Sequence, residues 1–437
     1  MELIREIIMI HNYDVIVAGG GPAGCAAAIS AAREGAKVLL VEAQYSLGGM
    51  STVGMVPVFA PFTDGVNTCS AGICDELIGR YKEKYNYDVT GEWGWVTINH
   101  EIMKSVYDEF MLKYKVDVLF GTYICQAERV DNRINSVTVA NKRGLTTYKA
   151  KMYIDSTGDG DLAFFAGAEF EKGDKDGKLQ GSTLCFTISN INMEEFQKLP
   201  YLNAANPDSP IYDIINDDRF PMISDDHFCY TLSGDGVVTF NAGHIWGADS
   251  ENTHDIANKI MLGRQKAICY RDALAEYFPK AFGKSVLVST GAVLGTRESR
   301  RIMGDYILTT DDYLARRCFE DEIARACYYI DVHSSENDGL YKDKEHNNVT
   351  EYKPGESYGI PYRSLVAKGL DNLLCAGRII SCDRNVYGSI RVMPTCFTTG
   401  QAAGVAAAMA TEAGVHIRDI SIKELRQKLI NYGAYIK

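Results

Sequence analysis

Arginines are the side chains of this sequence that are best suited to holding an anion. Three of them, Arg297, Arg300 and Arg301, fall within residues 296–302. If this segment is helical, Arg297 and Arg301 lie four residues apart on one face and Arg300 is offset. Guanidinium groups placed in this way form a fork for an anionic substrate or a cofactor phosphate. The structural alternative is a set of salt links between domains, made to Glu298, Asp305 or Asp312.

Two histidines are candidates for moving a proton. His333 follows Asp331, whose side chain is expected on the opposite face if the segment is a strand. His244 lies between Gly243 and Trp246 and is the second candidate general base. For each histidine, the alternative is an imidazole whose hydrogen bonds only stabilise the fold.

These groups need a scaffold, and the clearest one is encoded by residues 13–24. The apolar run 15–18 predicts a buried parallel strand. Gly19 permits a tight turn, Gly21 lets the backbone approach a pyrophosphate, and Gly24 lets the following helix pack against the strand. The N-terminus of that helix then offers free N–H groups to phosphates. The predicted contacts of this turn with a dinucleotide are Gly19, Gly21, Pro22, Ala23 and Gly24.

An acidic residue follows at the spacing that a dinucleotide requires. Glu42 ends a second apolar run, residues 38–41, and lies 18 residues beyond Gly24. Its carboxylate is expected to accept hydrogen bonds from the hydroxyls of the adenosine ribose. A 2′-phosphate at this position would meet a like charge, which argues against NADP.

Two later segments favour FAD among the dinucleotides. A strand ending at Gly158 and Asp159 is similar to the strand that passes beside the dinucleotide in flavoproteins of the glutathione-reductase type. A second strand ends at Gly377, and a helix containing Gly400 and Gln401 follows. In that layout the N-terminus of this helix, expected near residues 398–401, faces the N1–C2=O edge of the flavin. No second glycine motif follows a later strand, so a dedicated NAD(P)H domain is not expected.

The chain resembles the family of FAD-dependent oxidoreductases allied to the fumarate reductase and succinate dehydrogenase flavoprotein superfamily. Four blocks carry the resemblance: residues 19–24, 155–161, 295–302 and 377–404. His244 and residues 331–333 and 360–363 also look like elements of that family. The resemblance implies a flavin enzyme and leaves the substrate open.

The chain departs from the pattern of this superfamily at two positions. Arg378 follows Gly377, where an acid usually binds the ribityl hydroxyls; Asp159 or Asp383 is expected to replace that acid. The succinate dehydrogenase group has a histidine for covalent attachment beside its Gly-Gly loop, whereas no histidine is near Gly49 in the sequence. We therefore expect non-covalent FAD.

The expected fold class is α/β. A glutathione-reductase-type FAD-binding, Rossmann-like domain with a β-meander is predicted over residues 12–168 and 352–437. Between these segments, residues 169–351 are richer in charged, aromatic and asparagine residues and lack a βαβ rhythm. We interpret them as an inserted α+β substrate or cap domain.

The composition of the chain disfavours several classes of binding partner. A net charge of -12 disfavours nucleic acid and anionic membranes, and no apolar run reaches the roughly 20 residues needed to cross a bilayer. Residues 1–10 are short and contain Glu2 and Glu6, which disfavours a signal peptide. The 12 cysteines contain no C-x-x-C pair, so we expect no metal site and a reduced, cytoplasmic setting.

The sequence thus predicts an enzyme that transfers a hydride between FAD and a small polar, possibly anionic, organic substrate. Arg391, just before the flavin-facing turn, is expected to bind a substrate carboxylate or to stabilise charge on the reduced flavin. Its structural alternative is bonding to backbone carbonyls. Electrons would pass to oxygen, a quinone or a redox protein. The alternatives are an NAD(P)H-dependent flavin reductase without a nicotinamide domain and a flavin-bearing electron-transfer subunit. The oligomeric state is left open.

Overall fold

The apolar run before the first glycine motif forms the centre of a parallel sheet. The computed structural model of the chain describes residues 11–85, 94–337, 340 and 352–437. Strand β1 (His11–Ala18) pairs in parallel with β2 (Val38–Val41), and β2 pairs in parallel with β5 (Asp117–Leu119). The residues at 15–18 and 38–41 are buried, as expected for strands covered on both faces. The predicted α/β class with a parallel sheet is confirmed.

The long strand β8 (Gly144–Asp155) joins this parallel sheet to the predicted meander. Its first part pairs antiparallel with β7 (Arg133–Asn141), which pairs antiparallel with β6 (Tyr123–Val130). Strand β8 also pairs in parallel with β1, and its last three residues pair in parallel with β17 (Leu373–Cys375). The predicted meander and the later core strand therefore share one strand. The order of the main sheet is β5-β2-β1-β8-β7-β6, with β17 attached to β8.

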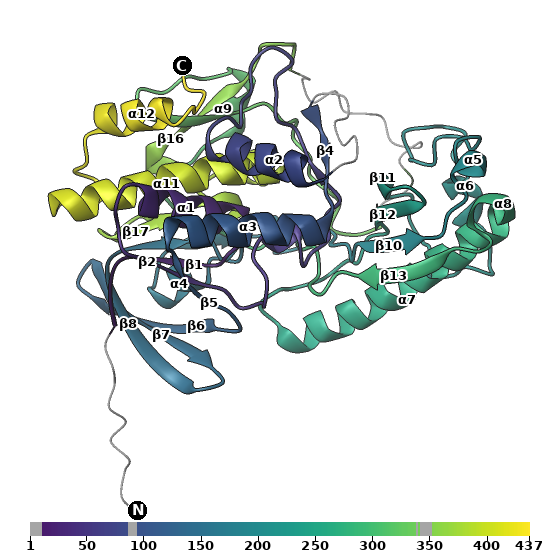
Figure 1. Cartoon of the computed structure of the whole chain (residues 1–437), viewed down its shortest axis with the longest axis horizontal. Helices are drawn as coiled ribbons and strands as arrows, with labels where there is room; N and C mark the ends of the chain where they lie inside the picture. The colour runs from purple at the N-terminus through teal and green to yellow at the C-terminus, as the bar shows by residue number, and fades with distance from the viewer. Residues whose placement is uncertain (1–10, 86–93, 338–339, 341–351) are drawn as a thin grey trace, which may run out of the picture.

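Helices α1 (Pro22–Arg33), α3 (His100–Tyr114) and α11 (Met393–Ala413) lie on one side of this sheet, while the meander curls away on the other (Figure 1). Asn99 caps α3, because its side chain accepts a hydrogen bond from the N–H of Ile102 at 3.2 Å.

Helix α11 begins earlier than predicted. It starts at Met393, with Val392 as its N-cap, so the start expected near residues 398–401 is wrong. Pro394 lies in the first turn, where a missing N–H breaks no helical hydrogen bond. The hydroxyls of Thr398 and Thr399 bond back to the carbonyl of Thr395, which lets these residues continue the helix.

Helices α1 and α11 pack backbone against backbone. A Cβ on Gly400 would lie 2.1 Å from the carbonyl oxygen of Ala23, and one on Gly404 would lie 2.2 Å from that of Ala27. The contacts advance by four residues along both helices in the same direction, so the helices run parallel. Their N-termini therefore lie at the same end of the layer.

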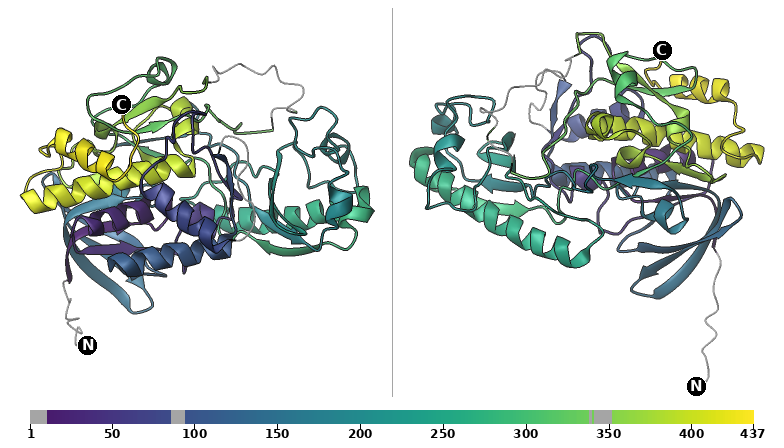
Figure 2. Two further views of the ribbon diagram at one scale, coloured as in Figure 1. Left: turned by 45° about the horizontal axis from the view of Figure 1, so that its top comes forward. Right: turned by 180° about the vertical axis from the view of Figure 1, so that it is seen from behind.

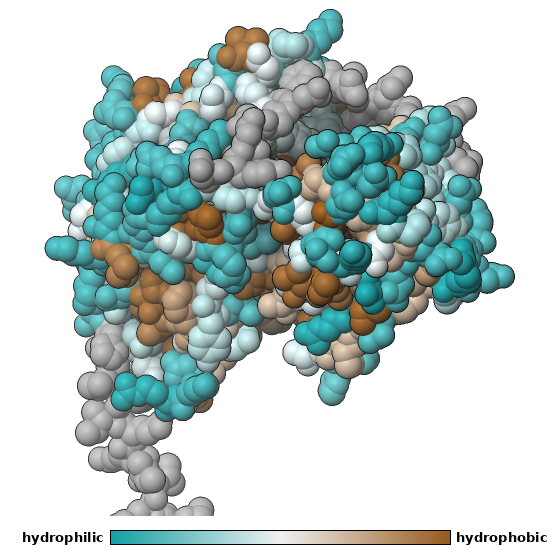
Figure 3. Space-filling model, turned by 45° about the vertical axis from the view of Figure 1, so that its right-hand side comes forward, coloured by the Kyte–Doolittle hydropathy of each residue, from teal (hydrophilic) through white to brown (hydrophobic). Residues whose placement is uncertain are grey.

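A second sheet lies to one side of the first, as both views in Figure 2 show. It is antiparallel, in the order β11 (Phe228–Gly234), β12 (Val237–Ala242), β10 (Phe186–Ser189), β13 (Val286–Thr290). Helix α7 (Thr253–Tyr277) packs on this sheet, and its Tyr270 stacks on Phe186. In Figure 3 hydrophobic side chains reach the surface on this side of the molecule among mainly hydrophilic ones, as on many soluble proteins.

The chain returns to the first core before residue 351. Strand β14 (Arg300–Ile302) pairs with β9 (Phe170–Lys172), and Ile302 packs with residues of the main sheet. Strand β15 (Glu322–Ala326) pairs with β16 (Tyr358–Pro361), and Ile323 belongs to the core of α1 and α11. The division at 169–351 stays a prediction, and Glu351 itself lies outside the described residues.

Shorter elements complete the described part of the chain. They are β3 (Val58–Phe59), β4 (Val96–Thr97), α2 (Ile73–Lys84), α4 (Asp161–Phe165), α5 (Met193–Phe196), α6 (Ile211–Ile214), α8 (Pro279–Phe282), α9 (Thr310–Leu314), α10 (Arg384–Ile390) and α12 (Ile422–Asn431). None of the helices in the described residues is long and apolar enough to cross a bilayer. Residues 1–10, where a signal peptide is not expected, lie outside the described part.

The packing of α11 on α1 leads to a stability prediction. Substituting Gly404→Ala adds a Cβ 2.2 Å from the Ala27 carbonyl oxygen, so backbone must move. We expect a loss of about 1–3 kcal/mol in the free energy of unfolding, as is typical of overpacking. Urea unfolding followed by circular dichroism measures it.

Gly79→Ala is the matched control for this substitution. Gly79 is an exposed residue of α2, and an added Cβ there meets no heavy atom within 4 Å. This variant should be neutral or stabilised by up to about 1 kcal/mol, the difference in helix propensity between glycine and alanine. Equal effects of the two variants would contradict the packing argument.

Candidate functional site

The turn between β1 and α1 has the geometry that its glycines predict. Gly19 has φ +88°, and a Cβ on it would lie 2.5 Å from the carbonyl oxygen of Ser156. A Cβ on Gly24 would lie 1.8 Å from the carbonyl oxygen of Gly19, so only glycine allows α1 to start so close to β1. The space beside Gly21 is open for 4 Å, and α1 has no side-chain cap. Open space beside free helical N–H groups suits a phosphate.

Glu42 is fixed at the end of β2. Its carboxylate accepts hydrogen bonds from the N–H of Gly20 at 2.6 Å and of Gln44 at 2.7 Å. The residue is 8% exposed, and this burial raises its pKa although the two N–H groups act in the opposite direction. The two hydrogen bonds leave lone pairs on both oxygens for further donors.

The loop that carries Gly49 crosses the glycine turn. A Cβ on Gly49 would lie 3.1 Å from the Cα of Gly21. One histidine approaches this loop in space although none is near it in sequence: Nδ1 of His100 lies 3.0 Å from the carbonyl oxygen of Ser51. Burial lowers the pKa of His100, so its ring is neutral. The sequence could not show this approach, because Ser51 and His100 belong to segments 49 residues apart.

Arg378 joins the ends of β8 and β17. Its guanidinium donates to the carbonyl oxygen of Gly158, to a carboxylate oxygen of Asp159 at 2.7 Å and to the carbonyl oxygen of Thr296 at 3.1 Å. Gly377, with φ +78°, faces Ala23 at the start of α1, where a Cβ would lie 2.9 Å from the Cβ of Ala23. The residues predicted at 158–159 and 377–378 therefore lie together beside the glycine turn.

Three other predicted cofactor residues have structural partners. Asp383 caps α10, since its carboxylate accepts from the N–H of Val386 at 2.9 Å, and it also binds Thr310. Gly400 packs against Ala23, and the side-chain oxygen of Gln401 accepts from the N–H of Ile73 at 2.6 Å. The end of α11 that faces the site is thus the turn at Val392–Pro394, seven residues before Gly400.

A cavity of about 210 Å³ lies between the two sheets, next to this turn. It has an apolar wall from the first half of the chain and a polar wall from the later segments. Its lining residues are Met50, Val56, Val58, Ala60, Trp95, Thr183, Cys185, Asn241, Gly295, Thr296, Arg297, Tyr328, Asp331, His333, Arg378, Arg391, Val392 and Met393. Three of the four residues proposed for catalysis therefore border one cavity.

Arg297 and Arg391 reach this cavity together. Arg297 donates to the carbonyl oxygen of Gly181 at 2.7 Å and to the hydroxyl of Thr183 at 2.9 Å. Burial, and then the charge of Arg391, lower the pKa of Arg297 to about 10. Arg391 donates to the carbonyl oxygens of Asp331 at 2.6 Å and of Arg297 at 3.1 Å, as its structural alternative predicted, and it lines the cavity as well.

Arg300 and Arg301 have structural roles. The segment is a loop followed by β14, so the expected helical face of Arg297 and Arg301 is wrong. Arg301 pairs with Glu298 at 2.8 Å, and Arg300 pairs with Glu251 at 2.8 Å. Glu298 also accepts from Arg384 and is 1% exposed. The salt links expected as the alternative for this cluster are therefore found at Glu298, and they hold β14.

The two candidate histidines form one hydrogen-bonded chain with two carboxylates. Nδ1 of His244 lies 2.9 Å from Oδ1 of Asp225, and Nε2 of His244 lies 2.8 Å from Nδ1 of His333. Nε2 of His333 lies 3.3 Å from Oδ1 of Asp331. The expectation that Asp331 lies on the opposite face is wrong, because residues two apart share a face even in a strand, and residues 327–334 form no strand. Burial, followed by the charge of Arg297, lowers the pKa of His333 to about 3.

Sequence reasoning missed two residues of this chain. Asp225 orients His244, and the ring of His227 lies 4.4 Å from that of His244 between centroids. His227 comes just before β11 and His244 just after β12, and these strands pair with Phe228 opposite Ala242. Only the register of the β11–β12 hairpin shows that these residues meet His244, and the sequence does not reveal that register. The single local indication was the Asp-Asp-His sequence at 225–227.

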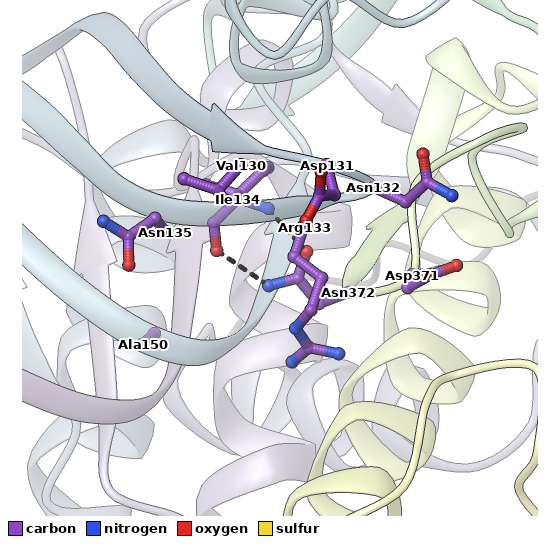
Figure 4. A pocket seen from close by; sticks show the side chains of 9 residues that line it. All are labelled: Val130, Asp131, Asn132, Arg133, Ile134, Asn135, Ala150, Asp371 and Asn372. Atoms are coloured by element: carbon purple, nitrogen blue, oxygen red, sulfur yellow. Dashed lines mark hydrogen bonds between the residues drawn. The ribbon is translucent and has the colours of Figure 1, made fainter.

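A second hollow, of about 450 Å³, lies at the base of the meander (Figure 4). Asn372 donates to the carbonyl oxygen of Ile134 at 2.9 Å, the bond drawn dashed, and accepts from its N–H at 2.9 Å. The guanidinium of Arg133 donates a hydrogen bond to the carbonyl oxygen of Lys151 at 3.3 Å. The hollow contains none of the predicted site residues, and these polar side chains tie the meander to β17.

One family model matches almost the whole chain. It is described as "FAD dependent oxidoreductase" and covers residues 14–429. This range includes most of β1, all of β2, the residues that line the cavity and α11.

Curated relatives match over a short segment. The soluble pyridine nucleotide transhydrogenase of Chromohalobacter salexigens is 54% identical over 43 residues, which is 10% of this chain and 9% of that protein. The enzyme of the same name from Pseudomonas putida is 47% identical over 49 residues, 11% of each. The matched segment thus spans about a tenth of these relatives, and their activity does not carry over to the chain.

Solved structures resemble the chain at low identity. A geranylgeranyl bacteriochlorophyll reductase-like protein from Thermoplasma acidophilum has a TM-score of 0.47 at 12% identity, covering 98% of this chain and 93% of that one. The p-nitrophenol 4-monooxygenase PnpA from Pseudomonas putida has a TM-score of 0.46 at 11% identity, covering 96% of this chain and 84% of that one. At these TM-scores neither activity carries over to the chain.

The buried charges beside the cavity give a second stability prediction. Glu298→Gln removes the carboxylate that Arg301 and Arg384 share. Because it leaves a buried guanidinium without its counter-ion, we expect a loss of about 3–5 kcal/mol in the free energy of unfolding. Denaturant unfolding of the purified variant measures it.

The control is Glu194→Gln, which breaks an exposed pair with Lys198 on α5. Its effect should stay within about 0.5 kcal/mol, as for exposed pairs in general. If Glu298→Gln were equally mild, the Glu298 cluster would not be what holds β14.

Proposed function

The chain belongs to the family of FAD-dependent oxidoreductases, and from this premise we propose that it transfers a hydride between FAD and a small anionic organic molecule. The substrate would bind in the cavity between the two sheets, with residues 169–351 acting as the substrate domain. Kinship with the fumarate reductase superfamily is part of this proposal. The observation that carries it is the pair of guanidiniums, Arg297 and Arg391, that border the cavity with only one carboxylate, Asp331, which lies 3.7 Å from Arg391.

FAD is the cofactor of this family, and the residues of the chain fit a dinucleotide. The pyrophosphate would lie in the open space beside Gly21, on the free N–H groups of α1. Glu42 would accept the ribose hydroxyls with the lone pairs that Gly20 and Gln44 leave free. The proposed contacts are Gly19, Gly21, Pro22, Ala23, Gly24, Glu42, Gly49, Gly158, Asp159, Gly377 and Arg378.

The turn at Val392–Pro394 takes the role first expected of residues 398–401. It is an uncapped helix N-terminus that borders the cavity, so its dipole would favour negative charge on a reduced flavin. Gly400 and Gln401 are not part of the proposed site, because they pack α11 against α1 and α2. When bound, FAD supplies the hydride chemistry of the reaction.

The two arginines explain why the substrate should be an anion. Arg297 is held by Gly181 and Thr183, and Arg391 by two carbonyl oxygens, so both guanidiniums are fixed before a ligand arrives. The two guanidiniums carry two positive charges, of which Asp331 can balance only one. A substrate carboxylate between them would balance the other. Fixed donors lose little conformational entropy on binding, which favours a tight and oriented complex.

We place the proton transfer at a water molecule bound by Arg297. Both ring nitrogens of His244 and of His333 already contact a carboxylate or the other imidazole. Neither ring therefore has a nitrogen free to act on a substrate. The guanidinium of Arg297 would hold and orient this water by hydrogen bonds, and the water would carry the proton to or from the substrate.

Electrons must leave or enter the flavin in a second half-reaction. The second sheet is antiparallel and does not have the parallel βαβ form of a nicotinamide-binding unit. We therefore propose that oxygen, a quinone or a separate redox protein completes turnover. NAD(P)H acting directly on the flavin is the alternative that the screen below distinguishes.

The decisive experiment is an anaerobic substrate screen of the purified protein. Absorbance near ~450 nm, from oxidised flavin, should fall when a suitable hydroxy acid, amino acid or related small carboxylate is added. Bleaching by neutral analogues alone would contradict an anionic substrate. Rapid bleaching by NADH alone would favour the NAD(P)H-dependent alternative.

Glu42→Arg tests the adenosine site. The substitution removes the acceptor of the ribose hydroxyls and places a bulky cation in a buried position, so the variant should purify without yellow colour. The exposed Glu194→Arg is the control and should retain its flavin. Full flavin occupancy in Glu42→Arg would show that the adenosine site is misassigned.

Acid precipitation of the wild-type protein tests the mode of attachment. We expect FAD to be released into the supernatant, because no histidine lies near Gly49 in the sequence. A yellow pellet would mean covalent attachment, and His100 would be the first residue to examine.

Arg297→Gln tests the anion site. The affinity of the best-bound small carboxylate, followed by perturbation of the flavin spectrum, should fall at least about tenfold, since a hydrogen bond to a charged group contributes roughly 1.5–3 kcal/mol. Arg219→Gln, whose side chain is 58% exposed on the second sheet's side, should leave the affinity unchanged. Unchanged affinity in a folded, flavin-loaded Arg297→Gln protein would exclude Arg297 as the anion ligand.

A further inference from the structure

Three histidines from separate segments converge beside the cavity. His227, His244 and His333 each bring one ring nitrogen within 4.8 Å of the nitrogens of the other two. The hairpin β11–β12 places His227 and His244 side by side. His333 is held from the other side, because its N–H donates to the side-chain oxygen of Gln180 at 2.9 Å.

Two of these imidazoles are backed by carboxylates. Asp225 lies 2.9 Å from Nδ1 of His244, and Asp331 lies 3.3 Å from Nε2 of His333. A carboxylate only accepts, so the tautomers that suit both contacts place the N–H on Nδ1 of His244 and on Nε2 of His333. This arrangement orients the remaining nitrogen of a metal-binding histidine and raises its basicity.

With these tautomers, the contact between His244 and His333 lacks a proton. With both N–H groups directed at carboxylates, Nε2 of His244 and Nδ1 of His333 face each other at 2.8 Å with two lone pairs. Two lone pairs at this distance repel each other unless a cation lies between them. The cation is either an additional proton or a metal ion.

The position of His227 favours a metal ion over a proton as this cation. Its Nδ1 is buried and has no hydrogen-bond partner among the described residues. Its ring centroid lies 4.4 Å from that of His244 and 5.3 Å from that of His333. Its Nε2 lies 3.4 Å from a guanidinium nitrogen of Arg297. A proton shared by His244 and His333 leaves Nδ1 of His227 without a partner, whereas a metal ion would use a third imidazole.

We propose that His227, His244 and His333 bind one divalent first-row transition-metal ion, for which Zn²⁺ is the reference. Three imidazoles with a fourth position open to water or an anion form a known type of zinc site. Metal–nitrogen distances of ~2.0–2.1 Å would require the 2.8 Å contact to open by a few tenths of an ångström. This site goes beyond the proposed function and does not depend on it.

The charges around the site set a condition on binding. Asp225 and Asp331 offset the ion, while Arg297, Arg391 and Lys266 oppose it; Nζ of Lys266 lies 3.9 Å from Asp225. Because His333 borders the cavity, an anion bound there would reduce this repulsion. Metal binding should therefore tighten when a small carboxylate is present.

The test uses tag-free, flavin-loaded protein freed of metal with a chelator. Titration with Zn²⁺ by calorimetry, and with Co²⁺ followed by its visible absorption, should give about one ion per chain. X-ray absorption at the zinc edge should show imidazole nitrogens near ~2.0 Å. Absence of saturable binding of both ions would overturn the proposal and leave a shared proton at the His244–His333 contact.

His227→Asn is the critical variant, because it removes the third imidazole, whose Nδ1 makes no hydrogen bond among the described residues. It also removes the 3.4 Å contact of Nε2 with Arg297, so folding of the variant is checked first. Its affinity for Zn²⁺ should fall at least about tenfold, and that of Asp225→Asn should fall by about 10–100-fold through loss of the carboxylate behind His244. His416→Asn, whose side chain is 48% exposed, is the control and should bind normally. Unchanged affinity in a folded His227→Asn protein would overturn the three-histidine site. Flavin content, measured in parallel, distinguishes this outcome from failure of the proposed function.

Discussion

The close contact of α1 with α11 is the constraint on which the site depends. Gly400 and Gly404 bring the backbone of α11 onto the carbonyls of Ala23 and Ala27, so the two helices run parallel with both N-termini toward the cavity. Gly400 lies seven residues into α11 but faces the start of α1. At 1.5 Å per residue, α11 therefore extends roughly 9 Å beyond α1. Two uncapped helix ends at different depths suit a long ligand that carries negative charge at more than one point.

The first half of the site was predictable because its signals are local. The turn at Gly19 and Gly24 and the acid at Glu42 each depend on a few neighbouring residues and on steric rules that hold in any fold. The family model supports the cofactor for the same reason, since it covers the motifs that encode this turn. The start of α11 was misplaced because a Thr-Thr-Gly sequence resembles a boundary, whereas threonine hydroxyls that bond back to the previous turn let the helix continue.

For the polar wall of the cavity, the sequence predicted which types of residue take part but not how they are arranged. Arg297 and Arg301 are close in sequence but have different surroundings, because the chain enters β14 between them and sends Arg301 to Glu298. Asp225 and His227 join His244 through the register of β11 and β12, and His333 joins them from a loop about 90 residues later. Pairing across such distances depends on tertiary structure, which no spacing rule contains. The absence of a cysteine motif likewise said nothing about a cluster made of histidines.

The position of the charges reconciles an acidic chain with a site for anions. The net charge of -12 is a property of the whole molecule and governs solubility and association. At physiological ionic strength, exposed charges are screened beyond about 8 Å, so the acidic surface hardly affects a ligand inside the cavity. Arg297, Arg391 and the end of α11 are withdrawn from solvent, where their field is much less screened. The buried Glu298 pairs with Arg301 and Arg384, and no hydrogen bond or salt bridge links it to Arg297 or Arg391 among the described residues. The fold thus separates the arginines that stabilise it from those that remain available to a ligand.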